Sequence, residues 1–330
     1  ARSGLGMVQE KESKVFPESM QSRDVLNVLT AQCRELGIEI KCGQAARSIS
    51  RIEDGFLVSC TGGRYRSRLL VMATGGCSYP ATGSSGDGYG FARILGHSIS
   101  EIGPALSPVI IKNYPFSDLA GLSFSDLKLS LYRQIKIKEH RGDILFTHDG
   151  LSGPGILDLS RYIQAGDMIK ISFIPAERRE ELEKWLVEKS RNDGKKRLMS
   201  ALAGMPQSLP AGLQLSIRLT KRLLQISGIA LDLQLSQLTR EKRNRLIDNL
   251  TGLSLVVSDV CGFNAAMCTR GGVLTAEVDP KTMQSRLVQG LYLVGEVLDI
   301  DGDTGGYNLQ AAFSTGMLAA RSIKSTFKPS

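Results

Sequence analysis

Two apolar segments that end in glycine turns constrain this chain more than any other feature. Residues 69–73 form a continuous apolar run that leads into Thr74, Gly75 and Gly76, which is typical of a buried parallel strand that ends in a tight turn. Seven glycines fall within the 22 residues that begin at Gly75. They lead into a helix predicted over residues 89–95, so the N–H groups at its start would face an anion with no Cβ in the way. A long surface loop capped by serine and glycine is the alternative interpretation.

The second of these segments lies near the end of the sequence. Residues 291–294 form a short apolar strand, Gly295 and Glu296 follow it, and a glycine pair stands in the turn at residues 304–308. The helix predicted after this turn is rich in small side chains that would let it pack close to a sheet: Ala311, Ala312, Ser314, Gly316, Ala319 and Ala320. Its positive end would face whatever binds at the turn, and the Glu296 carboxylate suits hydrogen bonds to sugar or polyol hydroxyls. This spacing predicts an anionic or polyol cofactor without saying which one.

Composition restricts the class of protein. The length of 330 residues predicts two to three domains, and 42% apolar with 22% charged residues is ordinary for a globular protein. No apolar run approaches the roughly 18 residues that a membrane-spanning helix needs. The six cysteines show no C-x-x-C spacing and the three histidines are far apart, so neither a zinc site nor a disulfide framework is predicted. We therefore expect a reduced, cytoplasmic protein that binds no metal.

Positive charge is concentrated in one part of the chain. The formal net charge of +8 permits an anionic partner without requiring one. Residues 176–250 hold 15 basic and 9 acidic side chains, a net charge of +6. Their basic runs, at 195–197 and 240–245, could contact nucleic acid, but Trp185 is the only aromatic residue there and stacking on bases has little support. A solvated amphipathic surface is the favoured interpretation, and nucleic acid is the less favoured partner.

The order of predicted elements divides the chain. A short strand is expected over residues 38–42, within an α/β stretch that ends near Pro104. The simplest interpretation is one discontinuous α/β domain, formed by residues 1–104 and 254–330. A β-rich subdomain (105–175) and a helical, glycine-poor subdomain (176–253) would interrupt it.

Four segments, in order, resemble the YhiN/BaiN-like family of NAD(P)/FAD-dependent oxidoreductases. They are residues 73–89, 145–154, 271–273 and 295–310, and the last is the most specific match. The resemblance implies an α/β fold with a FAD-binding, glutathione-reductase-like (Rossmann-type) domain that carries the inserted β-rich and helical region. More distantly, the first segment is similar to the flavin domains of fumarate reductases and succinate dehydrogenases.

The resemblance also implies where FAD would lie. The turn at residues 73–76 would stand beside the adenosine and pyrophosphate, and the strand around Ala46 would contact the adenine through its backbone. Glu296 would meet the ribityl or phosphate part. The turn at residues 305–309 would bring backbone N–H groups to the flavin N1–C2 carbonyl, where a helix N-terminus stabilises the negative charge of reduced flavin. The implied cofactor-binding residues are Ala46, Ala73, Thr74, Gly75, Gly76, Gly272, Gly295, Glu296, Gly305, Gly306, Tyr307, Asn308 and Leu309.

One feature of that family is missing from this sequence. The family opens with a strand, a G-x-G-x-x-G turn and a helix that hold the pyrophosphate. The segment Gly4-Leu5-Gly6 is too short a pattern and follows no predicted strand, and the sequence starts at Ala1. We therefore expect an N-terminally incomplete chain, or one whose first β-α unit is supplied elsewhere.

These observations predict a FAD-dependent oxidoreductase. It would pass hydride from a reduced nicotinamide, NAD(P)H, through the flavin to a small organic acceptor, for example an activated C=C bond. The alternatives are a nucleic-acid-associated flavoprotein that uses the basic helical segment, and a fragment without activity. No feature of the sequence indicates an oligomeric state.

Three side chains invite a chemical role. His148, in a turn of the inserted region, is the candidate catalytic residue, because an imidazole titrates near neutral pH and could donate a proton to the substrate. A histidine bonded locally to stabilise its turn is the alternative. Cys77 has no partner cysteine at redox spacing and is expected to be inert. His97 is expected at the surface.

Overall fold

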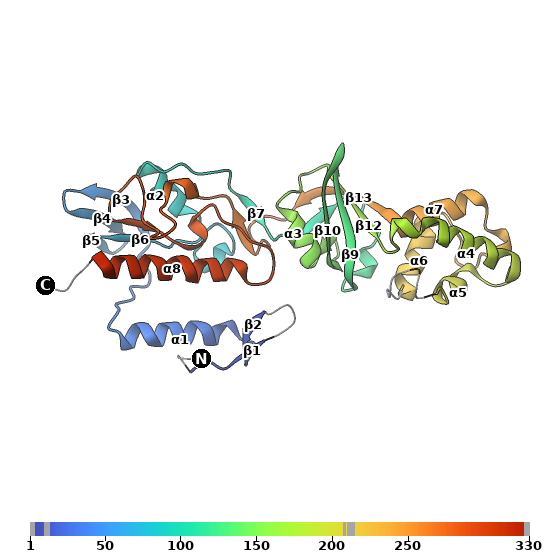
Figure 1. Ribbon diagram of the computed structural model, residues 1–330, viewed down its shortest axis with the longest axis horizontal. Helices are drawn as coiled ribbons and strands as arrows, with labels where there is room; N and C mark the ends of the chain where they lie inside the picture. The colour runs from blue at the N-terminus through green and yellow to red at the C-terminus, as the bar shows by residue number, and fades with distance from the viewer. Residues whose placement is uncertain (1–3, 10–13, 207–208, 210–214, 327–330) are drawn as a thin grey trace. The chain divides into compact units, whose positions relative to one another are not determined.

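The computed structural model of the chain describes residues 4–9, 14–206, 209 and 215–326 (Figure 1). The chain divides into two compact units. Residues 1–76, 84–102 and 271–330 form the first unit, and residues 77–83 and 103–270 form the second.

Two parallel strands organise the first unit. Strand β6 (Leu70–Met72) pairs with β15 (Leu291–Leu293), so that Leu70 lies opposite Leu291. Leu291 and Leu293 are fully buried and Met72 is buried, which suits strands of a parallel sheet. The parallel strand predicted over residues 69–73 is thus confirmed.

Antiparallel strands and helices complete the first unit. A three-stranded sheet contains β3 (Ala46–Ile52), β4 (Gly55–Cys60) and β5 (Gly63–Ser67). Two helices, α2 (Asp87–Ile94) and α8 (Tyr307–Thr326), follow the two glycine-rich segments. Nearer the N-terminus lie β1 (Met7–Gln9), β2 (Val15–Pro17) and α1 (Ser22–Glu35).

The strand expected over residues 38–42 is wrong. These residues form no strand, and Ile38 and Ile40 are both more than half exposed. Alternating apolar and polar residues form a strand only when a neighbouring strand takes up their backbone hydrogen bonds.

A closed six-stranded barrel forms the centre of the second unit, with neighbours in the order β10-β11-β8-β13-β12-β9. Its strands are β8 (Val109–Ile111), β9 (Ser123–Arg133), β10 (Ile135–Phe146), β11 (Gly150–Ser152), β12 (Met168–Ser172) and β13 (Leu253–Val260). The barrel encloses a continuous apolar core. In that core, Phe146 meets Phe116 and Phe124 edge to face, with ring centroids 5.5 and 5.8 Å apart.

Helices leave the barrel after β12 and return before β13. They are α4 (Arg179–Asn192), α5 (Leu198–Ala203), α6 (Ile217–Ile226) and α7 (Arg240–Gly252). Leu182 and Leu186, one turn apart, face the core from α4. The Ser216 and Thr239 hydroxyls accept a backbone N–H at the starts of α6 and α7. Helix α3 (Pro154–Ser160) packs against β10, and β7 (Gly103–Ala105) pairs with β14 (Cys268–Arg270).

The boundary expected at residue 254 is wrong. Strand β13 pairs with β12 on one side and β8 on the other, so the chain returns to the barrel after the helices and closes it. The first unit therefore resumes only at Gly271. The sequence shows an apolar strand after residue 253 but nothing that names its partners.

Candidate functional site

The carboxyl ends of β6 and β15 both run into glycine turns. The Val294 N–H donates to the Met72 carbonyl at 3.1 Å, so the segments that follow β6 and β15 leave the sheet side by side. Gly75 (φ +71°) and Gly295 (φ +74°) then adopt the left-handed conformation that glycine accepts without strain. In open α/β sheets, ligands bind outside the carboxyl ends of the strands. The two turns found in the sequence therefore stand at the edge where a cofactor is expected.

The first turn of α2 packs against the turn that follows β6. A Cβ added at Gly88 would lie 1.9 Å from the Thr74 Oγ1 atom, so only glycine lets the helix come this close. The Gly86 N–H donates to the Gly76 carbonyl at 3.1 Å and closes the intervening loop. The start of α2 is thereby held beside residues 74–76, and β3, which begins at Ala46, contacts the same helix.

The turn after β15 is held from two sides. The Tyr89 hydroxyl, on α2, donates to the Glu296 carbonyl at 3.4 Å. The Gly295 N–H donates to the Thr315 Oγ1 atom of α8 at 2.9 Å, and the Cβ position of Gly295 is 3.7 Å from the Ala312 Cβ. The small side chains of α8 thus let it lie directly on this turn. The two glycine segments therefore lie next to each other within the first unit.

Residues 305–309 leave room for a ligand. Gly305 (φ +124°) and Gly306 (φ +90°) precede α8, and nothing lies within 4 Å of a Cβ placed on Gly306. Tyr307 and Leu309 are 64% and 67% exposed. The first N–H groups of a helix lack partners within it, so a ligand at this turn would face the start of α8. The Asn308 amide group faces inward: it exchanges two hydrogen bonds with the Gly302 backbone, at 2.8 and 3.1 Å.

Gly272 serves the packing of the chain itself. A Cβ there would lie 2.6 Å from the Leu298 carbonyl atoms and 2.7 Å from the Val297 oxygen. The neighbouring Val273 N–H donates to the same Val297 oxygen at 2.9 Å. The absence of a side chain therefore lets two backbones meet behind the Glu296 turn.

His148 and Cys77 lie in the second unit. His148 is exposed in the turn between β10 and β11. Thr147 and Gly150 close that turn between themselves, and the His148 ring bonds to no described residue. The local stabilising role is therefore not supported. The Cys77 N–H donates to the buried Thr269 hydroxyl at 2.8 Å, and its thiol is free of any disulfide.

Comparison with known proteins decides the family. A model of the HI0933-like protein Rossmann domain matches residues 1–322. The chain belongs to this family. It is 34% identical to the 3-dehydro-bile acid delta(4,6)-reductase of Clostridium scindens over 328 residues, which cover 97% of this chain and 78% of that protein. It is also 30% identical to the ribosomal RNA dihydrouridine synthase of Escherichia coli (98% of this chain, 77% of that protein) and 27% identical to that of Haemophilus influenzae (98% and 78%).

Membership makes this chain a flavin-dependent oxidoreductase of a FAD-binding family with a Rossmann-type domain. The expected fold class, family and enzyme class are thus confirmed. The two glycine turns of the first unit lie together at the carboxyl ends of β6 and β15.

His97 is buried, and its expected surface position is wrong. Its Nδ1 lies 3.0 Å from a Glu277 oxygen, and its Nε2 lies 2.9 Å from the Ser285 Oγ atom. That hydroxyl oxygen already accepts the N–H groups of Leu287 and Val288, so its proton points at Nε2 and the ring proton sits on Nδ1. The imidazole therefore links the segment that follows α2 to Glu277 and Ser285. No local pattern could reveal partners about 180 residues away.

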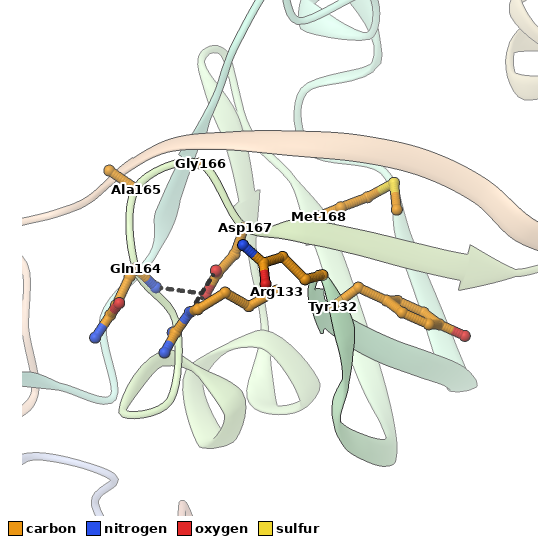
Figure 2. Close-up of a pocket in the computed structure, with 8 residues that line it drawn as sticks. Tyr132, Arg133, Gln164, Ala165, Gly166, Asp167 and Met168 are labelled. Atoms are coloured by element: carbon orange, nitrogen blue, oxygen red, sulfur yellow. Dashed lines mark hydrogen bonds and ion pairs between the residues drawn. The ribbon is translucent and has the colours of Figure 1, made fainter.

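A cleft of about 440 Å³ opens at one end of the barrel, between the β9–β10 turn and residues 164–168 (Figure 2). Figure 2 shows the Arg133 and Asp167 side chains pointing toward one another. Arg133 donates to both Asp167 oxygens, at 2.8 and 2.9 Å, and to the Tyr162 carbonyl at 3.0 Å. The guanidinium therefore closes the barrel end rather than offering its donors to a ligand.

Among the described residues, no three His, Cys, Asp or Glu side chains gather as a metal site. No helix among the described residues is long and apolar enough to cross a membrane.

Proposed function

We propose that this flavoprotein reduces an activated C=C bond of a small organic molecule and takes its electrons from NAD(P)H. Both relatives' names describe hydrogen added across a C=C bond, in a bile acid and in a uridine. Bound FAD would supply the chemistry, because a flavin accepts hydride from a nicotinamide and passes it to an acceptor. The bile-acid reductase makes a conjugated small molecule the first candidate.

The convergence of two glycine turns at the ends of β6 and β15 carries this proposal. Backbone N–H groups of residues 74–76 would hold the pyrophosphate, with the start of α2 packed against that turn. Glu296 would bind the ribityl or phosphate part, and the backbone of residues 305–309 would stabilise negative charge on the reduced ring. Ala46, Ala73 and Gly295 would shape the remaining wall of the site, whereas Gly272 packs behind it.

His148 is the proposed proton donor to the reduced acceptor. Its exposed ring makes no bond that would consume its proton, and the second carbon of an activated double bond must gain a proton. A His148→Gln variant is expected to slow acceptor reduction and to leave flavin reduction by NAD(P)H unchanged. Equal rates for both half-reactions in variant and parent would remove His148 from the mechanism.

The cytoplasm is the proposed location. No disulfide joins any of the six cysteines, and cysteines stay reduced in reducing compartments.

Anaerobic half-reactions test the proposal directly. The FAD-loaded protein is mixed with NADH or NADPH while the blue flavin band is followed. The reduced protein is then mixed with a conjugated steroid ketone or with its saturated analogue. We expect bleaching by one nicotinamide and recovery of the band only with the unsaturated ketone. If neither NADH nor NADPH bleaches the flavin, the proposed donor is overturned, and if neither ketone restores the band, the small-molecule acceptor is overturned.

A second candidate acceptor is a uracil base within RNA. Two relatives carry the name ribosomal RNA dihydrouridine synthase, and residues 176–250 carry the net charge of +6 that an RNA backbone would favour. Ribosomal RNA isolated from cells lacking this protein is the substrate to offer. Dihydrouridine that forms only when reduced flavin is present would support the RNA acceptor. If no dihydrouridine forms, the small molecule is the remaining candidate acceptor.

A further inference from the structure

Three consecutive cations of the helical region follow the end of α4, at residues 195–197. Residues 189–197 hold five cations and one carboxylate. Lys189 and Arg191 occupy the last turn of α4, and Lys195, Lys196 and Arg197 follow directly. We call residues 189–197 the basic turn.

The single carboxylate of the basic turn is already occupied. Asp193 accepts from Lys189 at 3.0 Å and from Lys196 at 2.9 Å. Hydrogen bonds from Lys196 and Lys189 lower the pKa of Asp193, so it stays ionised at neutral pH. Arg191, Lys195 and Arg197 are exposed and form no ion pair within the described residues. Three charges of the basic turn are therefore exposed and unpaired among the described residues.

The backbone that carries these charges is fixed. The Ser236 N–H donates to the Gly194 carbonyl at 2.9 Å, and the Leu235 N–H donates to the Lys196 carbonyl at 3.0 Å. Arg197 forms a β-bridge with Gln234. A Cβ at Gly194 would lie 3.0 Å from the Ser190 carbonyl and 3.2 Å from the Ser236 Cβ. A rigid backbone loses less entropy when its side chains engage a partner.

We propose that the basic turn binds the phosphate backbone of RNA. This inference rests on the RNA acceptor of the preceding subsection and names the surface that would hold it. Trp185 is the only aromatic side chain of the helical region and is partly buried against the core. Contacts through this surface therefore go to phosphates, which position a nucleic acid without reading its bases.

Salt-dependent binding of a probe tests this assignment on the full chain. The probe is a fluorescein-labelled RNA stem-loop of arbitrary sequence. One variant carries Arg191→Gln, Lys195→Gln and Arg197→Gln. Its matched control carries Lys112→Gln, Lys184→Gln and Lys221→Gln, which removes three equally exposed charges scattered over separate elements. The slope of log K against log salt is negative. We expect its magnitude to be smaller by about 3 in the first variant, because each lost phosphate contact reduces that magnitude by about 1. The control should keep the parent slope.

Three outcomes would overturn the proposal: equal losses in both variants, an unchanged slope in the first, or preferential binding of phosphatidylserine vesicles over RNA. The measurement needs no turnover, so a failure of the flavin chemistry would leave its result unchanged. Equally, acceptor reduction with a conjugated ketone should be the same in both variants. A loss there in the first variant alone would indicate damage to the fold, which the single substitution Lys195→Gln would then avoid.

Discussion

Two regions of the molecule use glycine differently. Where β10 meets α3 in the second unit, glycine lets the chain approach itself: a Cβ at Gly142 would lie 2.6 Å from the Gly155 Cα atom. At the start of α8 in the first unit, Gly306 has a left-handed backbone, and no described atom lies within 4 Å of its Cβ position. The first kind of glycine is explained by packing. The second kind is explained by its backbone conformation, and it stands where a ligand is expected.

The two units also differ in how completely they bury their apolar side chains. The barrel and its helices share one continuous apolar cluster, built by residues such as Phe146 and Leu182. In the first unit, Leu309, Phe313 and Met317 follow one face of α8 and are each more than half exposed, and α1 buries no side chain. The second unit is thus built around one continuous core, whereas the first unit leaves apolar side chains of α1 and α8 exposed.

Gly306→Val gives the largest effect that we expect from this comparison. A β-branched residue is poorly tolerated at φ +90°, and its methyl groups would occupy the open space beside the turn. We expect loss of bound FAD with the second unit intact. Flavin per chain is read from its absorbance, and the fluorescence of Trp185, the only tryptophan, reports on the second unit.

Cys77→Ser is the control for this variant. Cys77 carries no disulfide, and its structural bond uses the backbone N–H, so flavin content should stay at the parent value. Retained flavin in the valine variant would place the cofactor at a different turn.

Gly88→Ala and Gly90→Ala separate the two kinds of glycine within one helix. At Gly88 the added methyl would meet Thr74 at 1.9 Å, whereas nothing lies within 4 Å of the same atom at Gly90. Gly88→Ala should cost about 1–3 kcal/mol of unfolding free energy through overpacking and should weaken FAD binding. Gly90→Ala should stabilise α2 by about 0.5–1 kcal/mol. Urea unfolding and FAD titration of the pair check this, and equal behaviour would refute the packing of α2 on Thr74.

The sequence reveals features that depend on neighbours along the chain. The strand predicted over residues 69–73 is observed as β6, and the helix expected over residues 89–95 begins at Asp87. Both apolar runs before the glycine turns are strands. They could be predicted because the apolar run and the glycines that end it are neighbours in the sequence. The site's glycines could be named for the same reason, although their separate duties, such as the packing role of Gly272, need coordinates.

Features that depend on distant partners stay hidden. Nothing in residues 253–260 indicates that they close a barrel begun at Val109. The burial of His97 depends on Glu277 and Ser285. The pairing of Arg133 with Asp167 joins a strand end to a loop 34 residues later, and neither residue stands in a recognisable motif.

That last pair makes the stability of the second unit sensitive to acid. Asp167 is 2% exposed. Burial favours its neutral form, but hydrogen bonds from Arg133 and from the Gln164 N–H outweigh burial, so the pKa of Asp167 lies below its usual range. A carboxylate whose pKa is depressed by folding stabilises the protein fully above its unfolded pKa, and this contribution is lost as the pH falls through the folded value.

We therefore expect a small loss of stability of the second unit that begins near the unfolded pKa, about 3.9, and grows as the pH falls further. Asp167→Asn should be less stable at neutral pH, since it weakens the bond to Arg133, and its stability should change less across the acid range. Urea unfolding followed by Trp185 fluorescence at successive pH values measures both curves in this unit alone. If the parent and the variant lose stability in parallel as acid is added, the acid sensitivity comes from other carboxylates, and the barrel end does not depend on this ion pair.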